Sequence, residues 1–414
     1  MRINNDILME IEQCERSLAE RFAEIDRICF VNQVKVLNAM QKYNLAERHF
    51  TATTGYAYTD EGRDITEEIF AEVFGGEKAL VRPQIVSGTH AISLALFGVL
   101  RPGDEMLSIT SAPYDTIQTA IGMNDSAKGQ GTLKEYGVTY SQTEFDENGE
   151  IDLDAACAAI NERTKVVFMQ RSTGYSKRKA LGINDIEKAV NRVRSVKEDV
   201  CIILDNCYGE FLDTREPLDV DVDLIAGSLI KNPGGGIAQT GGYVIGKEKY
   251  VTLAAARLTS PGIAFEVGAN MGVIRSYLQG LFYAPKVVSG AIKGAILTAK
   301  LMEDRGYEVF PRYTDERSDI IQAVVLGSEE MIIKYCRGIQ SASPVDSYVY
   351  PEPWDMPGYD SPIIMAAGNF VSGSSIELSA DAPIKEPYII YQQGGLTYEH
   401  AKVGLMYALE NITK

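Results

Sequence analysis

The stretch VCIILDNCYGEF, residues 200–211, decides the fold. A short apolar run that ends in an acidic residue is typical of a strand that is buried on both faces. A similar run, KVVFMQ (165–170), precedes it, and another, DLIAGSL (223–229), follows it. A helical pattern, INDIEKAVNRVRS (183–195), separates the first two runs. Strands divided by helices predict right-handed crossover units and a mostly parallel mixed sheet between helices, which is an α/β fold.

The regions on either side of this alternating pattern show other patterns of apolar residues. Apolar residues recur every three or four positions between about residues 4 and 43, which predicts amphipathic helix. Asp64, with Glu67 three positions later, is expected to cap a further helix that ends at Gly75 and Gly76. The C-terminal part mixes a long helical stretch, extended runs and a closing helix, and therefore predicts a smaller α+β domain.

These patterns predict three parts of the chain. We expect a helical arm over residues 1–50, a large α/β domain over 51–284 and a small α+β domain over 285–414.

Composition narrows the class of protein. The 414 residues carry a formal net charge of −17, so nucleic acids and anionic membranes are poor partners. No apolar run is long enough to span a bilayer, and the first residues do not resemble a secretory signal, so a cytoplasmic protein is expected. The six cysteines and three histidines show no zinc-binding spacing, and no metal site is predicted.

The segment IVSGTHAISLALFGVL (85–100) contains a candidate anion site. Ser87, Gly88 and Thr89 stand between the end of an apolar strand and the start of a helix. A glycine allows close approach of a ligand, and the free N–H groups of a first helical turn attract phosphate. The alternative is an ordinary strand-to-helix turn.

Two ionisable residues follow neighbouring strands. Asp205 directly follows the apolar run VCIIL (200–204), where the carboxyl end of a parallel strand faces the ligand crevice, although a helix-capping role is an alternative. Lys231, in GSLIKNPGGG (227–236), follows the next strand. Desolvation is expected to lower its pKa and to make its amine nucleophilic, whereas the alternative is a solvated lysine.

Together these three features point to one cofactor. Pyridoxal 5'-phosphate requires an anion site, a carboxylate for its ring nitrogen and a lysine that forms an imine with its aldehyde. Ser87 to Thr89, Asp205 and Lys231 supply these groups in that order, and the sequence therefore predicts a pyridoxal-phosphate site.

The same motifs, with SAPYDT (111–116) and the C-terminal segment 370–400, resemble the fold-type-I pyridoxal-phosphate enzymes of cystathionine and methionine metabolism. The most similar group is the methionine gamma-lyase-like "aluminium resistance protein" family. The resemblance extends over nearly the whole chain. It implies that Lys231 is the Schiff-base lysine and that Asp205 is the partner of the pyridine nitrogen.

The resemblance also assigns the remaining cofactor contacts. Gly88 and Thr89 match backbone amides on the phosphate, Ser228 matches a hydroxyl on the phosphate, and Tyr114 matches the aromatic residue stacked on the ring. The loop GYAYTDEGR (55–63) resembles the segment with which a neighbouring subunit reaches the phosphate. Tyr56 or Tyr58, together with Arg63, would fill that role, so a homodimer or homotetramer with a shared active site is expected.

Two departures from the family pattern concern the phosphate and the substrate. Ile230 stands where the broader family has a threonine beside the phosphate. No arginine matches the residue that binds the substrate carboxylate, and Arg171 and Lys385 are the two candidates to replace it. A lysine lacks the planar two-point contact of a guanidinium.

The resulting prediction is a carbon–sulfur lyase that acts on a sulfur-containing amino acid such as methionine, cystathionine or cysteine. Lys231 would remove the α-proton, Asp205 would keep the ring protonated, and Tyr114 would assist the departing sulfur. Transamination, γ-replacement and a non-catalytic pyridoxal-phosphate-binding role remain the alternatives.

Overall fold

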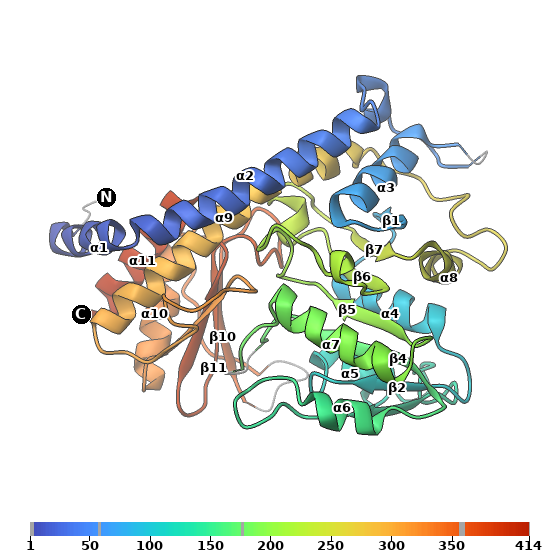
Figure 1. Cartoon of the computed structure of the whole chain (residues 1–414). Helices are drawn as coiled ribbons and strands as arrows, with labels where there is room; N and C mark the ends of the chain where they lie inside the picture. The colour runs from blue at the N-terminus through green and yellow to red at the C-terminus, as the bar shows by residue number, and fades with distance from the viewer. Residues whose placement is uncertain (1–3, 57–58, 175–177, 356–360, 414) are drawn as a thin grey trace.

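The computed structural model of the chain describes residues 4–56, 59–174, 178–355 and 361–413. Its large domain contains a seven-stranded sheet in the order β1-β7-β6-β5-β4-β2-β3 (Figure 1). The strands are β1 (Lys78–Arg82), β2 (Glu105–Ser108), β3 (Thr139–Gln142), β4 (Thr164–Gln170), β5 (Cys201–Asp205), β6 (Leu224–Ser228) and β7 (Gly242–Gly246). Neighbours from β6 to β3 are parallel, whereas β7 is antiparallel to β1 and β6. The predicted mostly parallel mixed sheet is confirmed.

Helices cover both faces of this sheet, and each face has its own apolar core. The helices are α3 (Glu61–Phe74), α4 (Gly88–Val99), α5 (Asp115–Ile121), α6 (Leu153–Ala159), α7 (Ile183–Val196) and α8 (Glu248–Leu258). Cys201 and Ile203 of β5 share a core with α4, α5 and α8, while Ile202 and Leu204 share the other core with α3, α6 and α7. This alternation is the period of two that a strand imposes.

Helix α3 begins one turn earlier than the sequence predicted. Asp60, not Asp64, is its N-cap, and its carboxylate accepts a hydrogen bond from the Arg63 backbone N–H at 3.0 Å. Asp64 lies inside the first turn, where its negative charge interacts favourably with the positive end of the helix dipole. The predicted end is correct, because Gly75 closes the helix in the left-handed conformation at φ 76°.

The small domain is built on an antiparallel five-stranded sheet in the order β10-β11-β12-β9-β8. Its elements are β8 (Val309–Phe310), β9 (Ile321–Val325), α10 (Glu329–Ser341), β10 (Ile363–Ala367), β11 (Ser379–Pro383), β12 (Ile389–Gln393) and α11 (Tyr398–Thr413). One sheet face packs in the main apolar core with α10 and α11. The other face carries Ile321, Ala323, Ile389 and Tyr391, and it is turned toward the large domain.

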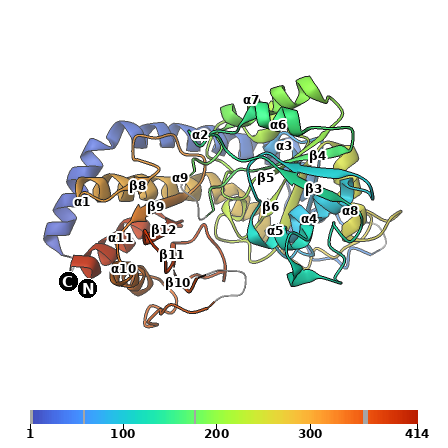
Figure 2. The same ribbon diagram turned by 90° about the horizontal axis from the view of Figure 1, so that it is seen from below.

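Three long helices connect the parts of the molecule. They are α1 (Asn5–Ser17) and α2 (Ala19–Lys42), which lie within the segment expected as a helical arm (1–50) and are separated by Leu18, and α9 (Ile274–Asp304). Helices α2 and α9 run side by side past both domains, as both ribbon views show (Figures 1 and 2). The domain boundary predicted at residues 284 and 285 falls inside the continuous helix α9.

Candidate active site

A cavity of about 380 Å³ lies where the carboxyl ends of β4, β5 and β6 meet the open face of the small sheet. Its large-domain wall includes Gly88, Thr89, Tyr114, Gln170, Asp205, Tyr208 and Lys231. Its small-domain wall includes Ile321, Met365, Asn369, Ser374, Ser375, Asp381, Tyr391 and Gln393. Asp205, Lys231, Gly88 and Thr89, which the sequence singled out, therefore line one cavity, whereas Ser87 and Ser228 are not among its described lining residues.

Asp205 is the last residue of β5, and its side chain is buried. One carboxylate oxygen, Oδ1, accepts a hydrogen bond from the Cys207 backbone N–H at 3.0 Å, which fixes the orientation of the group. Burial raises the pKa of Asp205, and the nearby Lys231 ammonium opposes this shift. Asp205 is thus a buried carboxyl group at the edge of the sheet, and the backbone of Cys207 fixes its orientation.

Lys231 follows β6 by three residues and points into the same cavity. Its Nζ lies 4.2 Å from the centroid of the Tyr208 ring. Burial lowers the pKa of Lys231, but Cys207, Tyr208 and Asp205 together outweigh burial and raise it above the ordinary value. The expected lowering of the Lys231 pKa is therefore wrong for the chain alone, because the neighbours of the amine outweigh the effect of burial.

The N-terminus of α4 forms the third part of the wall. The Ser87 hydroxyl caps the helix by accepting a hydrogen bond from the His90 backbone N–H at 3.1 Å. Gly88 faces Cys207 and Ser228, since a Cβ at Gly88 would lie 3.3 Å from the Cys207 Sγ and 3.5 Å from the Ser228 Cβ. Gly88 and Thr89 both line the cavity, so the N-terminus of α4 forms part of its wall.

Tyr114 is positioned by a residue that the sequence analysis did not select. Its backbone N–H donates to the Gln170 Oε1 at 2.7 Å, and its side chain is 42 % exposed at the cavity. Gln170 is the last residue of β4 and lies in the cavity wall. The signal that identifies it is its place at a strand end, the same signal that identified Asp205.

Neither candidate for the substrate carboxylate lines the cavity. Arg171 is 1 % exposed, and its guanidinium donates to the Leu181 carbonyl at 3.2 Å and to the Gly209 carbonyl at 2.6 Å. A further hydrogen bond, 2.9 Å long, joins it to the Asn206 Oδ1. Lys385 is exposed in the turn between β11 and β12. The Arg171 side chain therefore has a structural environment on the opposite face of the sheet.

The loop predicted to reach a neighbouring subunit also lies outside this cavity. Tyr56 is 77 % exposed, and Tyr58 lies outside the described residues. Arg63 is buried and donates to Asp64 at 2.9 Å and to the Gly268 carbonyl at 3.4 Å. The loop is anchored by Asn270, whose amide donates to the Thr51 carbonyl and to Asp60.

The small-domain wall contains polar groups that sequence reasoning missed. The hydroxyls of Ser374 and Ser375 are buried and have no hydrogen-bond partner within the described part of the chain. Glu377 holds their loop in place, because its carboxylate accepts from the Phe370 and Val371 backbone N–H groups at 2.8 and 2.9 Å. Both serines line the cavity, although their Oγ atoms themselves have almost no accessible surface.

The residues of the large-domain wall fit pyridoxal phosphate. The α4 N-terminus with the close approach at Gly88 suits a phosphate, the buried Asp205 suits a protonated ring nitrogen, and the Lys231 amine suits an aldehyde. Among the described residues, no cluster of His, Cys, Asp and Glu that suits a metal ion is present. Nor is any described helix both long and apolar enough to cross a membrane.

Comparison with known proteins identifies the family. The family model described as methionine gamma-lyase matches residues 7–413. The chain belongs to the methionine gamma-lyase family. The Bacillus subtilis (strain 168) protein YnbB is 47% identical over 97% of this chain and 95% of its own length. This family membership confirms the resemblance that the motifs indicated.

Two solved structures extend this result. A carbon–sulfur lyase involved in aluminium resistance from Clostridium novyi NT is 48% identical, with a TM-score of 0.95 over 99% of this chain and 96% of that chain. The pyridoxal-5'-phosphate-dependent protein YhfS from Escherichia coli shares only the fold, at 15% identity and a TM-score of 0.63 over 94% of this chain and 97% of that one. The fold-type-I architecture expected from the sequence is confirmed.

Proposed function

We propose that this member of the methionine gamma-lyase family is a pyridoxal-phosphate-dependent carbon–sulfur lyase that acts on a sulfur-containing amino acid. The observation that carries the proposal is the convergence of Asp205, Lys231 and the α4 N-terminus on one cavity. The name of the Clostridium novyi relative, a carbon–sulfur lyase, supports the same reaction class.

The large-domain wall would hold the cofactor and move protons. The backbone N–H groups of Gly88 and Thr89 and the Ser228 hydroxyl would bind the phosphate, and the Asp205 carboxylate would bind the ring nitrogen. When bound, pyridoxal phosphate withdraws electrons from the α-carbon of an amino acid and so makes the α-proton acidic. The Lys231 Nζ would accept that proton, and the Tyr114 hydroxyl would donate one to the departing sulfur.

The small-domain wall would bind the substrate. Ser374 and Ser375 line the cavity, and their buried hydroxyls have no hydrogen-bond partner in the described residues, so a rotation of either side chain would present a donor to the substrate. Hydrogen bonds from these hydroxyls to a substrate carboxylate would remove the free-energy cost of two buried polar groups without partners. Neutral donors at this wall are consistent with the lack of an arginine or lysine among its described lining residues.

We further propose that the loop of residues 55–63 completes the phosphate site of a neighbouring subunit, through Tyr56 or Tyr58 together with Arg63, whose side chain is buried in the single chain. Neither Tyr56 nor Arg63 lines the cavity of its own chain, and the loop is anchored through Asp60 and Asn270 at a fixed place on the surface. A homodimer or homotetramer would then be the active form, and dilution to monomer should abolish turnover.

The reaction itself is the test. The holoenzyme is incubated with L-methionine, L-cystathionine or L-cysteine, and thiol, 2-oxo acid and ammonia are measured. Elimination releases one of each product per substrate, with water consumed. Oxo acid formed only when an amino acceptor is added would indicate a transaminase, and bound cofactor without turnover of any amino acid would indicate a non-catalytic protein. Either result would contradict the proposal.

A further inference from the structure

The turn that follows β5 has an unusual backbone. Two of its residues, Tyr208 at φ 72° and Phe211 at φ 65°, adopt the left-handed conformation although neither is a glycine. That conformation is costly for a residue with a side chain, and it persists where the surrounding structure fixes it, often at a functional site. The turn begins directly after Asp205, and Tyr208 lines the cofactor cavity. The strained backbone therefore lies in the cavity wall.

Buried side chains of the large domain hold the turn on both sides of Tyr208. The Arg171 Nη1 donates to the Gly209 carbonyl at 2.6 Å. The Glu216 Oε1 accepts a hydrogen bond from the Phe211 backbone N–H at 3.0 Å. Arg171, which does not line the cavity, thus fixes the backbone of a residue next to one that does.

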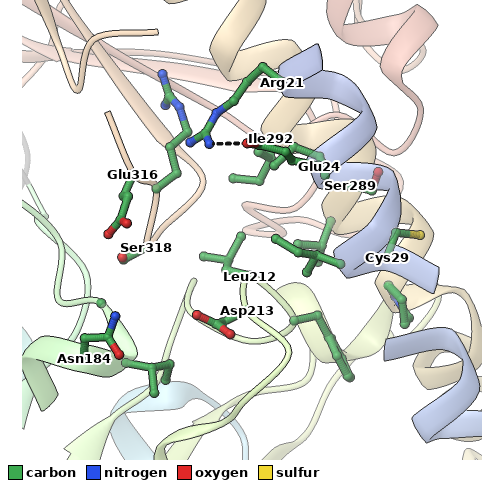
Figure 3. A pocket seen from close by; sticks show the side chains of 18 of the residues that line it. Arg21, Glu24, Cys29, Asn184, Leu212, Asp213, Ser289, Ile292, Glu316 and Ser318 are labelled. Carbon is green, nitrogen blue, oxygen red and sulfur yellow. Dashed lines mark hydrogen bonds and ion pairs between the residues drawn. The ribbon is translucent and has the colours of Figure 1, made fainter. Parts of the chain in front are cut away.

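Helix α2 of the arm holds the segment that continues from the turn. The buried Asn32 amide donates to the Phe211 carbonyl at 3.3 Å and to the Asp213 carbonyl at 2.9 Å. Figure 3 shows Leu212 and Asp213 on this segment, beside a cavity of about 190 Å³ that it shares with α2 and α9. The conformation of Tyr208 is therefore set from outside the cofactor cavity, by the large domain and by the arm.

The Tyr208 ring fixed in this way lies against Lys231. The Lys231 Nζ is 4.2 Å from the centroid of the ring, and both residues line the cofactor cavity. An ammonium group at this distance is attracted by the negative face of an aromatic ring, more strongly where water is excluded. A neutral amine lacks this attraction, so the ring favours the protonated form of Lys231.

Other titratable groups also act on the Lys231 amine. Those that the structure places around it or across the cavity are Asp205, Cys207, Glu210, Tyr114 and Asp381. The contribution of the Tyr208 ring is separated from theirs by a substitution that removes the ring and leaves every one of these groups in place.

We propose that Tyr208 is a positioning residue whose ring receives the Lys231 ammonium group after the amine has accepted the α-proton of the substrate. In that step the substrate C–H bond breaks, an N–H bond forms on Nζ, and the electron pair of the C–H bond remains with the substrate. The ring stabilises the new ammonium group and holds it beside the reacting carbon. This role in turnover rests on the proposed lyase function, whereas the contact between ring and amine belongs to the chain itself.

The first test uses the chain without cofactor. Lys231 is modified with trinitrobenzenesulfonate, or with formaldehyde and cyanoborohydride, at one pH below the pKa of the amine, and mass spectrometry of its peptide gives the rate. Tyr208→Leu removes the ring, Tyr208→Phe removes only the hydroxyl, and neither variant places a β-branched residue at the left-handed position.

Both reagents attack only the neutral amine. Loss of the ring should therefore raise the rate of Lys231 modification about tenfold in Tyr208→Leu, equally for the large and the small reagent. Tyr208→Phe should behave as the unmodified chain does. If Tyr208→Leu does not fold, Tyr208→Met takes its place in every measurement.

The second test uses the holoenzyme. Tyr208→Leu should lower kcat about tenfold with little change in KM, whereas Tyr208→Phe should keep kcat close to that of the unmodified chain. The matched control is Tyr136→Leu, at an exposed tyrosine of the large domain outside the cofactor cavity, and it should alter neither kcat nor the modification of Lys231.

Three outcomes would overturn the inference. They are equal modification rates in Tyr208→Leu and the unmodified chain, a rise seen with trinitrobenzenesulfonate but not with formaldehyde, which would show a change in access alone, and equal effects of Tyr208→Leu and Tyr208→Phe, which would assign the effect to the hydroxyl. The expected rise in a protein that converts no amino acid would support the contact between ring and amine and would contradict the proposed function instead.

Discussion

The two walls of the cofactor cavity differ in chemistry. The large-domain wall carries the ionisable groups Asp205 and Lys231 at the ends of parallel strands. The small-domain wall carries hydroxyls, amides and Asp381, and it has no arginine or lysine among its described lining residues. Under the proposed function, the large-domain wall would hold the cofactor and transfer protons, and the small-domain wall would select the substrate. Variants in each wall should therefore fail in different ways.

The largest effect is expected at Lys231. Lys231→Ala should lower kcat about a thousandfold or more, because the amine that attaches the cofactor and accepts the α-proton is lost. The yellow absorbance of the bound cofactor should disappear as well. Lys188→Ala, an exposed lysine on α7, is the matched control. Retention of the yellow band by Lys231→Ala would contradict the assignment.

The next largest effect is expected at Asp205. Asp205→Asn keeps an oxygen for the Cys207 backbone N–H but removes the negative charge, so kcat should fall roughly 100-fold. The cofactor spectrum should shift while the melting temperature changes little. Asp199→Asn, an exposed acid just before the same strand, should leave the rate unaltered. An unchanged kcat for Asp205→Asn would show that the carboxylate has no part in the reaction.

A smaller and different effect is expected on the opposite wall. Ser375→Ala should raise KM about tenfold and leave kcat and the cofactor spectrum almost unchanged. Because the Ser375 hydroxyl is buried without a partner among the described residues, its removal should not lower the melting temperature. Ser372→Ala, in an exposed position of the same loop, is the control. A fall in kcat with unchanged KM would contradict the division between the walls.

The smallest effect concerns stability. Glu210 accepts a hydrogen bond from the Tyr243 hydroxyl at 2.6 Å, and burial raises the pKa of Glu210 from 4.5 to about 8. Between these values the folded chain binds more protons than the unfolded chain, so stability falls as the pH rises. Glu210→Gln keeps the acceptor and removes this dependence.

Thermal unfolding between pH 5 and pH 8 checks the sign of that shift. The range runs from just above the ordinary pKa of a glutamate, 4.5, to the raised pKa of Glu210, about 8. The stability of Glu210→Gln relative to the unmodified chain should increase by about 1 kcal/mol or more across the range. The exposed Glu198→Gln should show no such trend. Parallel pH profiles for the Glu210 variant and the unmodified chain would contradict the raised pKa.

Arg171 is a predicted site residue that does not line the cavity. It directly follows β4, a strand whose carboxyl end lies at the cavity. Val166 and Phe168 belong to the α4 core, and Val167 and Met169 belong to the opposite core. The same alternation directs Gln170 to the cavity and Arg171 away from it. A strict application of the period of two would have selected Gln170, which holds Tyr114.

The small-domain wall was harder to predict for another reason. Ser374 and Ser375 lie in a loop without periodicity, between strands that pair antiparallel with each other. Their approach to the cavity depends on how the small sheet packs along α9, and on Glu377, which fixes the loop by two backbone hydrogen bonds. No local pattern encodes such a placement.

Local patterns in the sequence were enough to predict the parallel sheet, and they led to the hypothesis of a pyridoxal-phosphate site that contains Asp205 and Lys231. These follow from local rules, because apolar runs define strands and strand ends meet at one edge of a sheet. The packing of the small domain against the large domain decided which small-domain residues, among them Ser374 and Ser375, line the cavity. Such features arise where segments far apart in the chain come together, and only three-dimensional packing specifies which of them meet.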